Sequence, residues 1–288
     1  MSPSELSQIG EAARWACILE VCAPKAGNVH PDAPFENATA QDFIRSAEAI
    51  APILERAAHQ SVGQTILDCV IATQQAVGHN TNLGIILLLA PLCAVPLDEP
   101  MESGIDRVLW NLTVHDAELA FEAIRLAKPG GLGSADSEDV RTKPTITLRA
   151  AMQLAADRDA IARQYHLAFA DVTSLVAIDV AREGDLAQCI TRAHLLQMAR
   201  EPDTLIIRKC GLEVANESSL RAQRVLQSGW PNTAQGLEAF AEFDAWLRAD
   251  GHRRNPGTSA DLIAAGLFVA LRDGRIKPPF EWVQRMLR

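Results

Sequence analysis

Apolar residues recur along this chain at the spacing of buried helix faces, with little of the alternation expected of half-buried strands. The clearest example is the segment 61–96. Before its polar turn, Val62, Ile66, Val70 and Val77 share one helical face, and after the turn residues 83–92 are almost entirely apolar. The pattern predicts an all-α fold with about ten or more helices, given typical helix lengths.

Capping signals and further apolar runs place the other predicted helices. Four signals for a helix start are Ser2-Pro3-Ser4-Glu5, Thr39 with Asp42, Thr113 with Asp116, and Thr258 with Asp261. In the second half of the chain, helices are predicted over residues 148–165, 169–181, 186–198, 218–226 and 233–247. No fixed-period repeat is present, and we interpret residues 1–288 as a single globular multi-helix domain.

The composition narrows the functional classes. Hydrophobic residues make up 48% and charged residues 22% of the chain, as in globular proteins. The net charge of −9 argues against broad binding to nucleic acid or to a membrane, but it allows a nucleotide in a local pocket. Residues 83–95 are too few to cross a bilayer. The six scattered cysteines and the lack of a signal peptide pattern favour a cytoplasmic protein.

Polar turns interrupt the apolar helices at four places. In chain order they contain Lys25, Gly27, Asn28, His30 and Asp32; Asn80, Thr81, Asn82 and Gly84; Gly130 and Gly131; and Asn255, Gly257, Thr258 and Ser259. If these turns converge, they form a polar pocket between the helices. Asn82 is placed to cap the helix after it, and a helix N-terminus beside Gly84 suits phosphate. The alternative is that each turn only joins and caps two core helices.

A short charged segment, residues 203–209, also has two interpretations. Asp203 is placed to cap a short helix, with Arg208 and Lys209 near its C-terminal end. Two adjacent cations beside an apolar run are equally suited to hold a triphosphate. Similarly, a Thr258–Asp261 capping box explains those two residues without any function, but it does not explain Asn255 and Gly257.

Several of these segments together resemble a known family. In order, they are Lys25-Ala26-Gly27-Asn28-Val29, Asn80-Thr81-Asn82-Leu83-Gly84, Pro129-Gly130-Gly131-Leu132-Gly133, Asp203-Thr204-Leu205-Ile206-Ile207-Arg208-Lys209 and Asn255-Pro256-Gly257-Thr258-Ser259-Ala260-Asp261-Leu262. The sequence from about Ala12 to Phe268 is similar to the triphosphoribosyl-dephospho-CoA synthase family. Each motif alone is weak, but their order makes the signal specific.

The resemblance implies an all-helical enzyme that uses ATP and 3′-dephospho-CoA. The 2′-hydroxyl of the CoA ribose would displace adenine from C1 of the ATP ribose, and Mg²⁺ would accompany the triphosphate. The product would be a precursor of the prosthetic group of citrate lyase or malonate decarboxylase carrier subunits.

Two motifs depart from the citrate-lyase type. Ala26-Gly27 stands where that type has Pro-Gly, and Asn255-Pro256-Gly257-Thr258-Ser259 stands where it has Ser-Pro-Gly-Gly-Ser. These features are more similar to a divergent branch, some members of which are associated with one-carbon (tetrahydromethanopterin-type) metabolism. The resemblance therefore leaves the acceptor open between dephospho-CoA and a related cofactor precursor.

The implied reaction assigns candidate roles. It needs a base for the attacking hydroxyl, help for the leaving adenine, negative groups near the reacting carbon and cations for the triphosphate. The candidate bases are His30, Asp32 and Asp159, and the candidate Mg²⁺ ligands are Asp139, Asp203 and Asp261. The nucleotide-binding candidates are Lys25, Gly27, Asn28, Asn80, Thr81, Asn82, Gly84, Gly130, Gly131, Arg208, Lys209, Asn255, Gly257, Thr258 and Ser259.

Two other classes of function stay open on the sequence alone. One is a Mg²⁺-dependent hydrolase or ligase that acts on a phosphorylated cofactor precursor. The other is a non-catalytic, nucleotide-binding helical protein. In every case the expected partners are small nucleotides, and a homodimer is the assembly we consider.

Overall fold

The computed structural model describes residues 8–129 and 140–286, and every regular element within them is a helix. The prediction of an all-α fold is therefore confirmed. The predicted Ser2 capping signal and the candidates Gly130, Gly131 and Asp139 lie outside the described residues.

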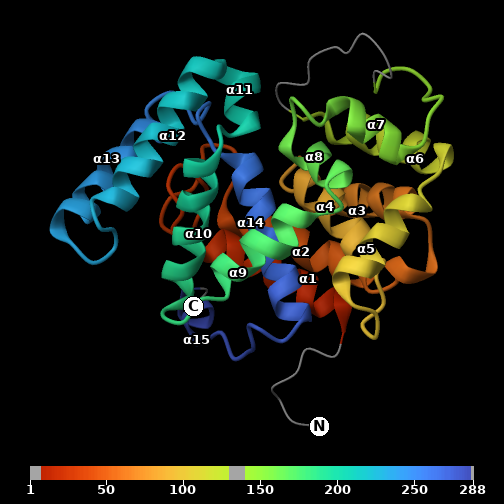
Figure 1. The fold of residues 1–288 in the computed structure, drawn as a ribbon, viewed down its shortest axis with the longest axis horizontal. Coiled ribbons are helices and arrows are strands. Elements are labelled where there is room, and N and C mark those ends of the chain that lie inside the picture. The colour runs from red at the N-terminus through yellow and green to blue at the C-terminus, as the bar shows by residue number, and fades with distance from the viewer. Residues whose placement is uncertain (1–7, 130–139, 287–288) are drawn as a thin grey trace.

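The first half of the chain forms helices α1 to α6, and Figure 1 shows their arrangement. Their bounds are Ile9–Cys22 (α1), Ala40–Leu54 (α2), Val62–Val77 (α3), Leu83–Cys93 (α4), Met101–Trp110 (α5) and Val114–Ala127 (α6), with a 3₁₀ turn at Ala57–His59.

The second half forms α7 to α15. Their bounds are Leu148–Ala155 (α7), Ala160–His166 (α8), Ala177–Val180 (α9), Leu186–Arg200 (α10), Thr204–Cys210 (α11), Leu212–Gln227 (α12), Ala234–Arg248 (α13), Gly257–Arg272 (α14) and Glu281–Met286 (α15), with a π-helical segment at Val172–Val176 before α9.

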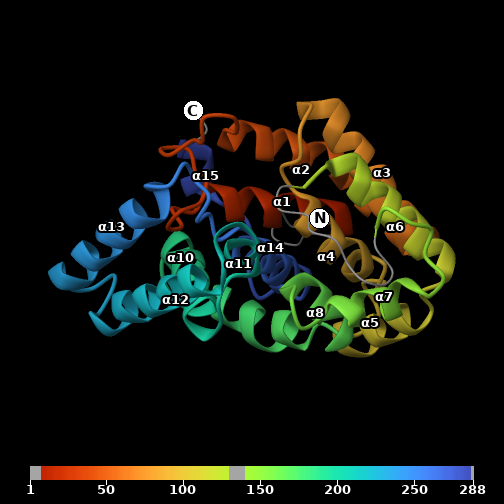
Figure 2. The same ribbon diagram turned by 90° about the horizontal axis from the view of Figure 1, so that it is seen from above.

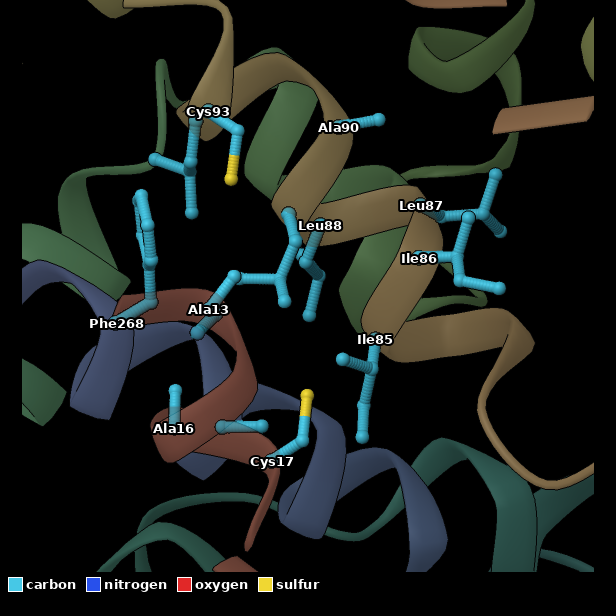
Figure 3. Packing of buried hydrophobic residues seen from close by; sticks show 14 of the residues in the cluster. Ala13, Ala16, Cys17, Ile85, Ile86, Leu87, Leu88, Ala90, Cys93 and Phe268 are labelled. Carbon is cyan, nitrogen blue, oxygen red and sulfur yellow. The ribbon is translucent and has the colours of Figure 1, made fainter. Parts of the chain in front are cut away.

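The core is built around α1, α4 and α14. Every residue of α4 except Gly84 is buried, as expected for a helix that is apolar on all sides. Figure 3 shows Ala13 and Cys17 of α1 packed near Leu88 of α4, with Phe268 of α14 beside them. Each fully buried Leu or Phe side chain stabilises the fold by about 1.5–3 kcal/mol. This core fixes the N-terminal ends of α4 and α14 relative to the C-terminal end of α1.

A second, smaller apolar cluster lies under α10 to α13. It includes Leu195 and Met198 of α10 and Phe243 of α13. Helix α10 also contributes Ile190 and Ala193 to the main core, so the two clusters share one helix. Figures 1 and 2 show the α12–α13 pair at one end of the molecule and α5 to α7 at the other. The single-domain interpretation stays a prediction.

Two predicted helix boundaries differ from the structure. The predicted helix 148–165 is interrupted between α7 and α8, because Asp159 caps α8 by accepting the amides of Ile161 and Ala162. The predicted helix 218–226 begins earlier, at Leu212, with Gly211 as the residue before its first turn. In the described part of the chain, no helix is both long and apolar enough to cross a membrane.

Candidate functional site

A cavity of about 1260 Å³ opens where three of the four predicted polar turns meet. Its walls come from the end of α1 and the loop after it, the α3–α4 turn, α6 to α8, the end of α11 and the start of α14. The nucleotide-binding candidates that line it are Asn28, Asn80, Thr81, Asn82, Gly84, Arg208, Lys209, Asn255 and Gly257, together with Asp159 and Asp261. The sequence candidates therefore converge although they are scattered along the chain.

The α3–α4 turn is held by its own polar side chains. The Oδ1 atom of Asn80 accepts the amides of Asn82 and Leu83, at 3.3 and 3.0 Å. Asn82 is the N-cap residue of α4, as predicted, but its side chain makes no capping hydrogen bond, because its Oδ1 instead accepts the hydroxyl of Thr73 at 3.1 Å. The side-chain amide nitrogen of Asn82 is buried with no hydrogen-bond partner among the described residues. The turn thus presents an unused donor beside the cavity.

Gly84 allows a carboxyl group to lie against the start of α4. A Cβ atom at this position would be 2.0 Å from Oδ2 of Asp261 and 2.7 Å from Cδ1 of Ile161. Any side chain would force these groups to move. The pKa of the Asp261 carboxyl is raised well above its ordinary value, first by burial and then by the charge of Glu20. Protein atoms around Asp261 therefore favour a neutral carboxyl or a positive ligand.

Asp203 joins α11 to α14. Its Oδ1 accepts the amides of Leu205 and Ile206, which confirms the predicted cap, and its Oδ2 accepts the amide and hydroxyl of Ser259 at 2.7 and 2.8 Å. Burial raises the pKa of Asp203, although these hydrogen bonds oppose that shift. Because its oxygens are occupied and it does not line the cavity, Asp203 is placed as a structural link.

The predicted Thr258–Asp261 capping box is wrong. Helix α14 already begins at Gly257, with Pro256 as its N-cap residue. The buried hydroxyl of Thr258 lies 3.2 Å from that of Thr204, and Asp261 lines the cavity. The physical reason is that Asp203 satisfies the Ser259 amide, so the start of α14 does not need a local side chain there.

Arg208 and Lys209 form a positive wall of the cavity. Nη1 of Arg208 lies 2.5 Å from Oδ2 of Asp159. Lys209 is partly buried and makes no ion pair with the described residues. Burial and the neighbouring charge of Arg208 lower the pKa of Lys209. An anion beside Lys209 would oppose both effects, because it favours the charged ammonium group.

Lys25 lies in a different environment. It is 1% exposed and does not line the cavity. Its Nζ is 2.9 Å from Oε1 of Glu20 and also donates to the backbone carbonyls of Glu20 and Ala23. Glu20 does line the cavity, yet the sequence reasoning missed it. The available signal was a single acidic residue among the buried positions at the end of α1.

The remaining candidates of the loop after α1 lie beside the cavity rather than in it. The Gly27 amide donates to Oδ1 of Asp244 at 2.7 Å, and its φ of +73° suits glycine. His30 forms an isolated bridge with Ala33, and Asp32 is exposed. Burial and the charge of Arg248 lower the pKa of His30. Neither His30 nor Asp32 lines the cavity.

An aromatic pair in the cavity wall was also missed. The rings of Phe35 and His252 stack with centroids 4.0 Å apart, and both residues line the cavity. They come from distant loops, so no sequence spacing connects them. Among the described residues, no group of three or more His, Cys, Asp or Glu side chains is arranged to hold a metal ion.

Comparisons with known proteins agree with this architecture. A structure from Archaeoglobus fulgidus, assigned as a triphosphoribosyl-dephospho-CoA synthase, is similar with a TM-score of 0.66 and 25% identity, covering 80% of this chain and 99% of that one. The 2-(5''-triphosphoribosyl)-3'-dephosphocoenzyme-A synthase of Klebsiella pneumoniae is 38% identical over 88 residues. That match covers 31% of this chain and only 28% of the relative.

The strongest comparison is with a family model. The model described as ATP:dephospho-CoA triphosphoribosyl transferase (CitG) matches residues 6–279, which is nearly the whole chain. The matched range includes every helix that contributes to the cavity. With the helical fold and the convergent polar turns, this match shows that the chain belongs to the ATP:dephospho-CoA triphosphoribosyl transferase family.

Proposed function

We propose that this protein transfers the triphosphoribosyl group of ATP to 3′-dephospho-CoA, or to a related cofactor precursor, and releases adenine. The observation that carries the proposal is the position of Arg208 and Lys209 in one cavity with Asp159 and Asp261. The cations suit a triphosphate, and the carboxyl groups suit the positive charge that develops at a ribose C1′ when its base leaves.

The proposed triphosphate subsite lies between α11 and the start of α4. Lys209 supplies a charge without an ion-pair partner in the described structure, and Arg208 lines the same cavity while paired with Asp159. The amides of Gly84 and Ile85 have no hydrogen-bond acceptor within the described residues. Free amides at a helix start favour an anion. We keep Asn80, Thr81 and Asn82 in this subsite as residues that shape the turn.

The size of the cavity fits a reaction between two substrates. Its volume of about 1260 Å³ exceeds the roughly 300–1,000 Å³ typical of pockets for one small ligand. Its walls also have an apolar part, which includes Phe121, Met152 and Leu154. We propose that this part receives the longer, less charged portion of the acceptor, while the triphosphate lies near Arg208.

The donor set fits Mg²⁺ only as an ion shared with the substrate. Asp203 is fully hydrogen-bonded, and no cluster of three ligating side chains exists in the described residues. Of the three candidate metal ligands, Asp261 is the one among the described residues that lines the cavity, and Mg²⁺ is commonly held by one or two carboxylates plus phosphate oxygens. When bound, the ion would neutralise phosphate charge. We therefore retain Asp261 and leave Asp203 out of the proposed metal set.

Product analysis tests the proposal directly. The purified protein is incubated with Mg-ATP and 3′-dephospho-CoA, and the products are identified by mass spectrometry. We expect free adenine and a triphosphoribosylated CoA species in equal amounts. ADP or AMP without adenine would instead indicate a hydrolase or ligase, and bound but intact ATP would indicate a non-catalytic protein. Adenine release with pterin precursors but not with dephospho-CoA would reassign the acceptor alone.

A further inference from the structure

The buried ion pair at the end of α1 is the feature that the proposed nucleotide site leaves unexplained. The Glu20 side chain is 6% exposed and that of Lys25 is 0% exposed. Burying two charges costs free energy of desolvation, and an apolar pair of similar size would often stabilise a core as well. A pair of this kind therefore calls for a reason beyond packing.

Lys25 has no capacity left for a ligand. Its ammonium group has three donors, and three acceptors surround it: Oε1 of Glu20 and the carbonyls of Glu20 and Ala23. It also lies behind the cavity wall rather than in it. This arrangement opposes the sequence-based interpretation of Lys25 as a triphosphate ligand.

Glu20 has the opposite geometry. Only its Oε1 is engaged by Lys25, and no described residue donates a hydrogen bond to Oε2. Its side chain belongs to the cavity wall, which it shares with Asp261 and Asn28. Helices α1 and α14 pack against each other, and Glu20 and Asp261 belong to the wall of the same cavity. The charge of Glu20 contributes to the raised pKa of Asp261, which places the two groups within electrostatic reach.

We propose that Glu20 is the catalytic base of the transfer reaction and that Lys25 is the positioning residue that fixes it. The inference rests on the proposed function. In this step the bond between C1′ and N9 of ATP breaks, and its electron pair leaves with adenine. The 2′-hydroxyl oxygen of the acceptor forms the new bond to C1′. The hydroxyl proton passes to Oε2 of Glu20 and finally, through solvent, to adenine.

This assignment separates two carboxyl groups by their surroundings. Glu20 is paired with the Lys25 ammonium at 2.9 Å, whereas no ion pair joins Asp261 to another described residue. Two acidic groups in one site with different partners are a common arrangement for groups with different roles. His30 and Asp32, the bases suggested by the sequence, do not line the cavity, and Asp159 is occupied by a helix cap and Arg208.

The test is a double-mutant cycle on the purified protein with Mg-ATP and dephospho-CoA. We expect E20Q to lower kcat by about 100-fold or more, in the range typical of a lost general base. KM for ATP should stay within about threefold, since Glu20 does not hold the triphosphate. K25M should lower kcat in the same way, and K25M should add little in the E20Q background because it acts through Glu20. E11Q, an acidic position of α1 away from the cavity, is the matched control and should retain wild-type kinetics.

Each other result has a defined meaning. If the wild type releases adenine and kcat of E20Q stays within about threefold of the wild-type value, this inference is overturned and the proposed function is left intact. If K25M has a higher KM for ATP and an unchanged kcat, Lys25 binds the triphosphate and does not position Glu20, which overturns the inference. An E20Q variant that is rescued by higher Mg²⁺ would make Glu20 a metal ligand. If E20Q alone does not fold, the double variant E20Q/K25M replaces it, because it leaves no unpaired charge in the interior. We expect the same loss of kcat for the double variant as for E20Q. Failure of the wild type to release adenine would overturn both proposals.

Discussion

Two lysines that the sequence suggests for the same task lie in opposite environments. Lys25, after α1, is enclosed by three oxygen acceptors and lies behind the cavity wall. Lys209, at the end of α11, lines the cavity and has no ion-pair partner in the described structure. One charge is satisfied by the protein, and the other is available to a ligand. The difference shows that the local electrostatic environment decides which cation can bind an anion, rather than residue type or motif membership.

The largest expected effect concerns the satisfied lysine. K25M removes the partner of Glu20 and leaves a buried, uncompensated carboxylate, which should lower the free energy of unfolding by about 3–5 kcal/mol. Chemical denaturation at neutral pH measures this value. E20Q/K25M should recover much of the loss because it removes both charges. A K25M protein as stable as the wild type would break the comparison, since Lys25 would then not be a structural partner of Glu20.

The next effect concerns the available lysine. K209M should weaken ATP binding by about 10- to 100-fold, as expected when one hydrogen bond to a charged group, worth about 1.5–3 kcal/mol, is lost. Its free energy of unfolding should change little, because Lys209 is partly exposed and lies next to Arg208. Titration calorimetry with ATP and no acceptor isolates binding from chemistry. Unchanged affinity in K209M would place the triphosphate elsewhere in the cavity.

The contrast also explains how far the sequence could predict this site. Helices follow from local periodicity, and the Asp203 cap follows from residues two and three positions away. The place of Gly84 at a helix start was enough to predict it as a site residue, but its close approach to Asp261 could not be predicted from the sequence. Local rules gave the wrong cap for α14, because the Ser259 amide is satisfied by an aspartate from another helix.

Other features depend on the folded chain as a whole. The Phe35–His252 stack joins two loops that are far apart in the sequence, so no sequence spacing predicts it. Glu20 is close to Lys25 in sequence, but it lies among the buried, mostly apolar positions of α1, so the apolar pattern gave no reason to propose it as a site residue. The sequence supplied the residue types near the cavity, whereas tertiary packing determined which of them face it.

The smallest expected effect is a pH dependence at the Lys25 end of the site. His194 is fully buried, with Nε2 3.4 Å from Nδ2 of Asn28. Burial, helped by the charge of Lys25, lowers the pKa of His194 to about 3. Its ordinary value is near 6.5, so the unfolded chain binds a proton below that pH while the folded protein does not. The stability associated with neutral His194 is therefore complete above pH 6.5 and is lost as the pH falls toward 3.

Between these limits the loss should be about 1.4 kcal/mol for each pH unit. H194Q removes the titrating group, so the stability difference between wild type and H194Q should shift by about 1 kcal/mol between pH 6.5 and 5.5, because half of the unfolded chains are already protonated at pH 6.5. Denaturation of both proteins at the two pH values measures the shift, and other acidic groups cancel in the difference. H166Q, at an exposed histidine, is the control and should show no such shift. An unchanged H194Q difference would mean that His194 can be protonated in the folded state. The buried end of the site would then admit a second positive charge beside Lys25, and the contrast with Lys209 would be one of position rather than of electrostatic environment.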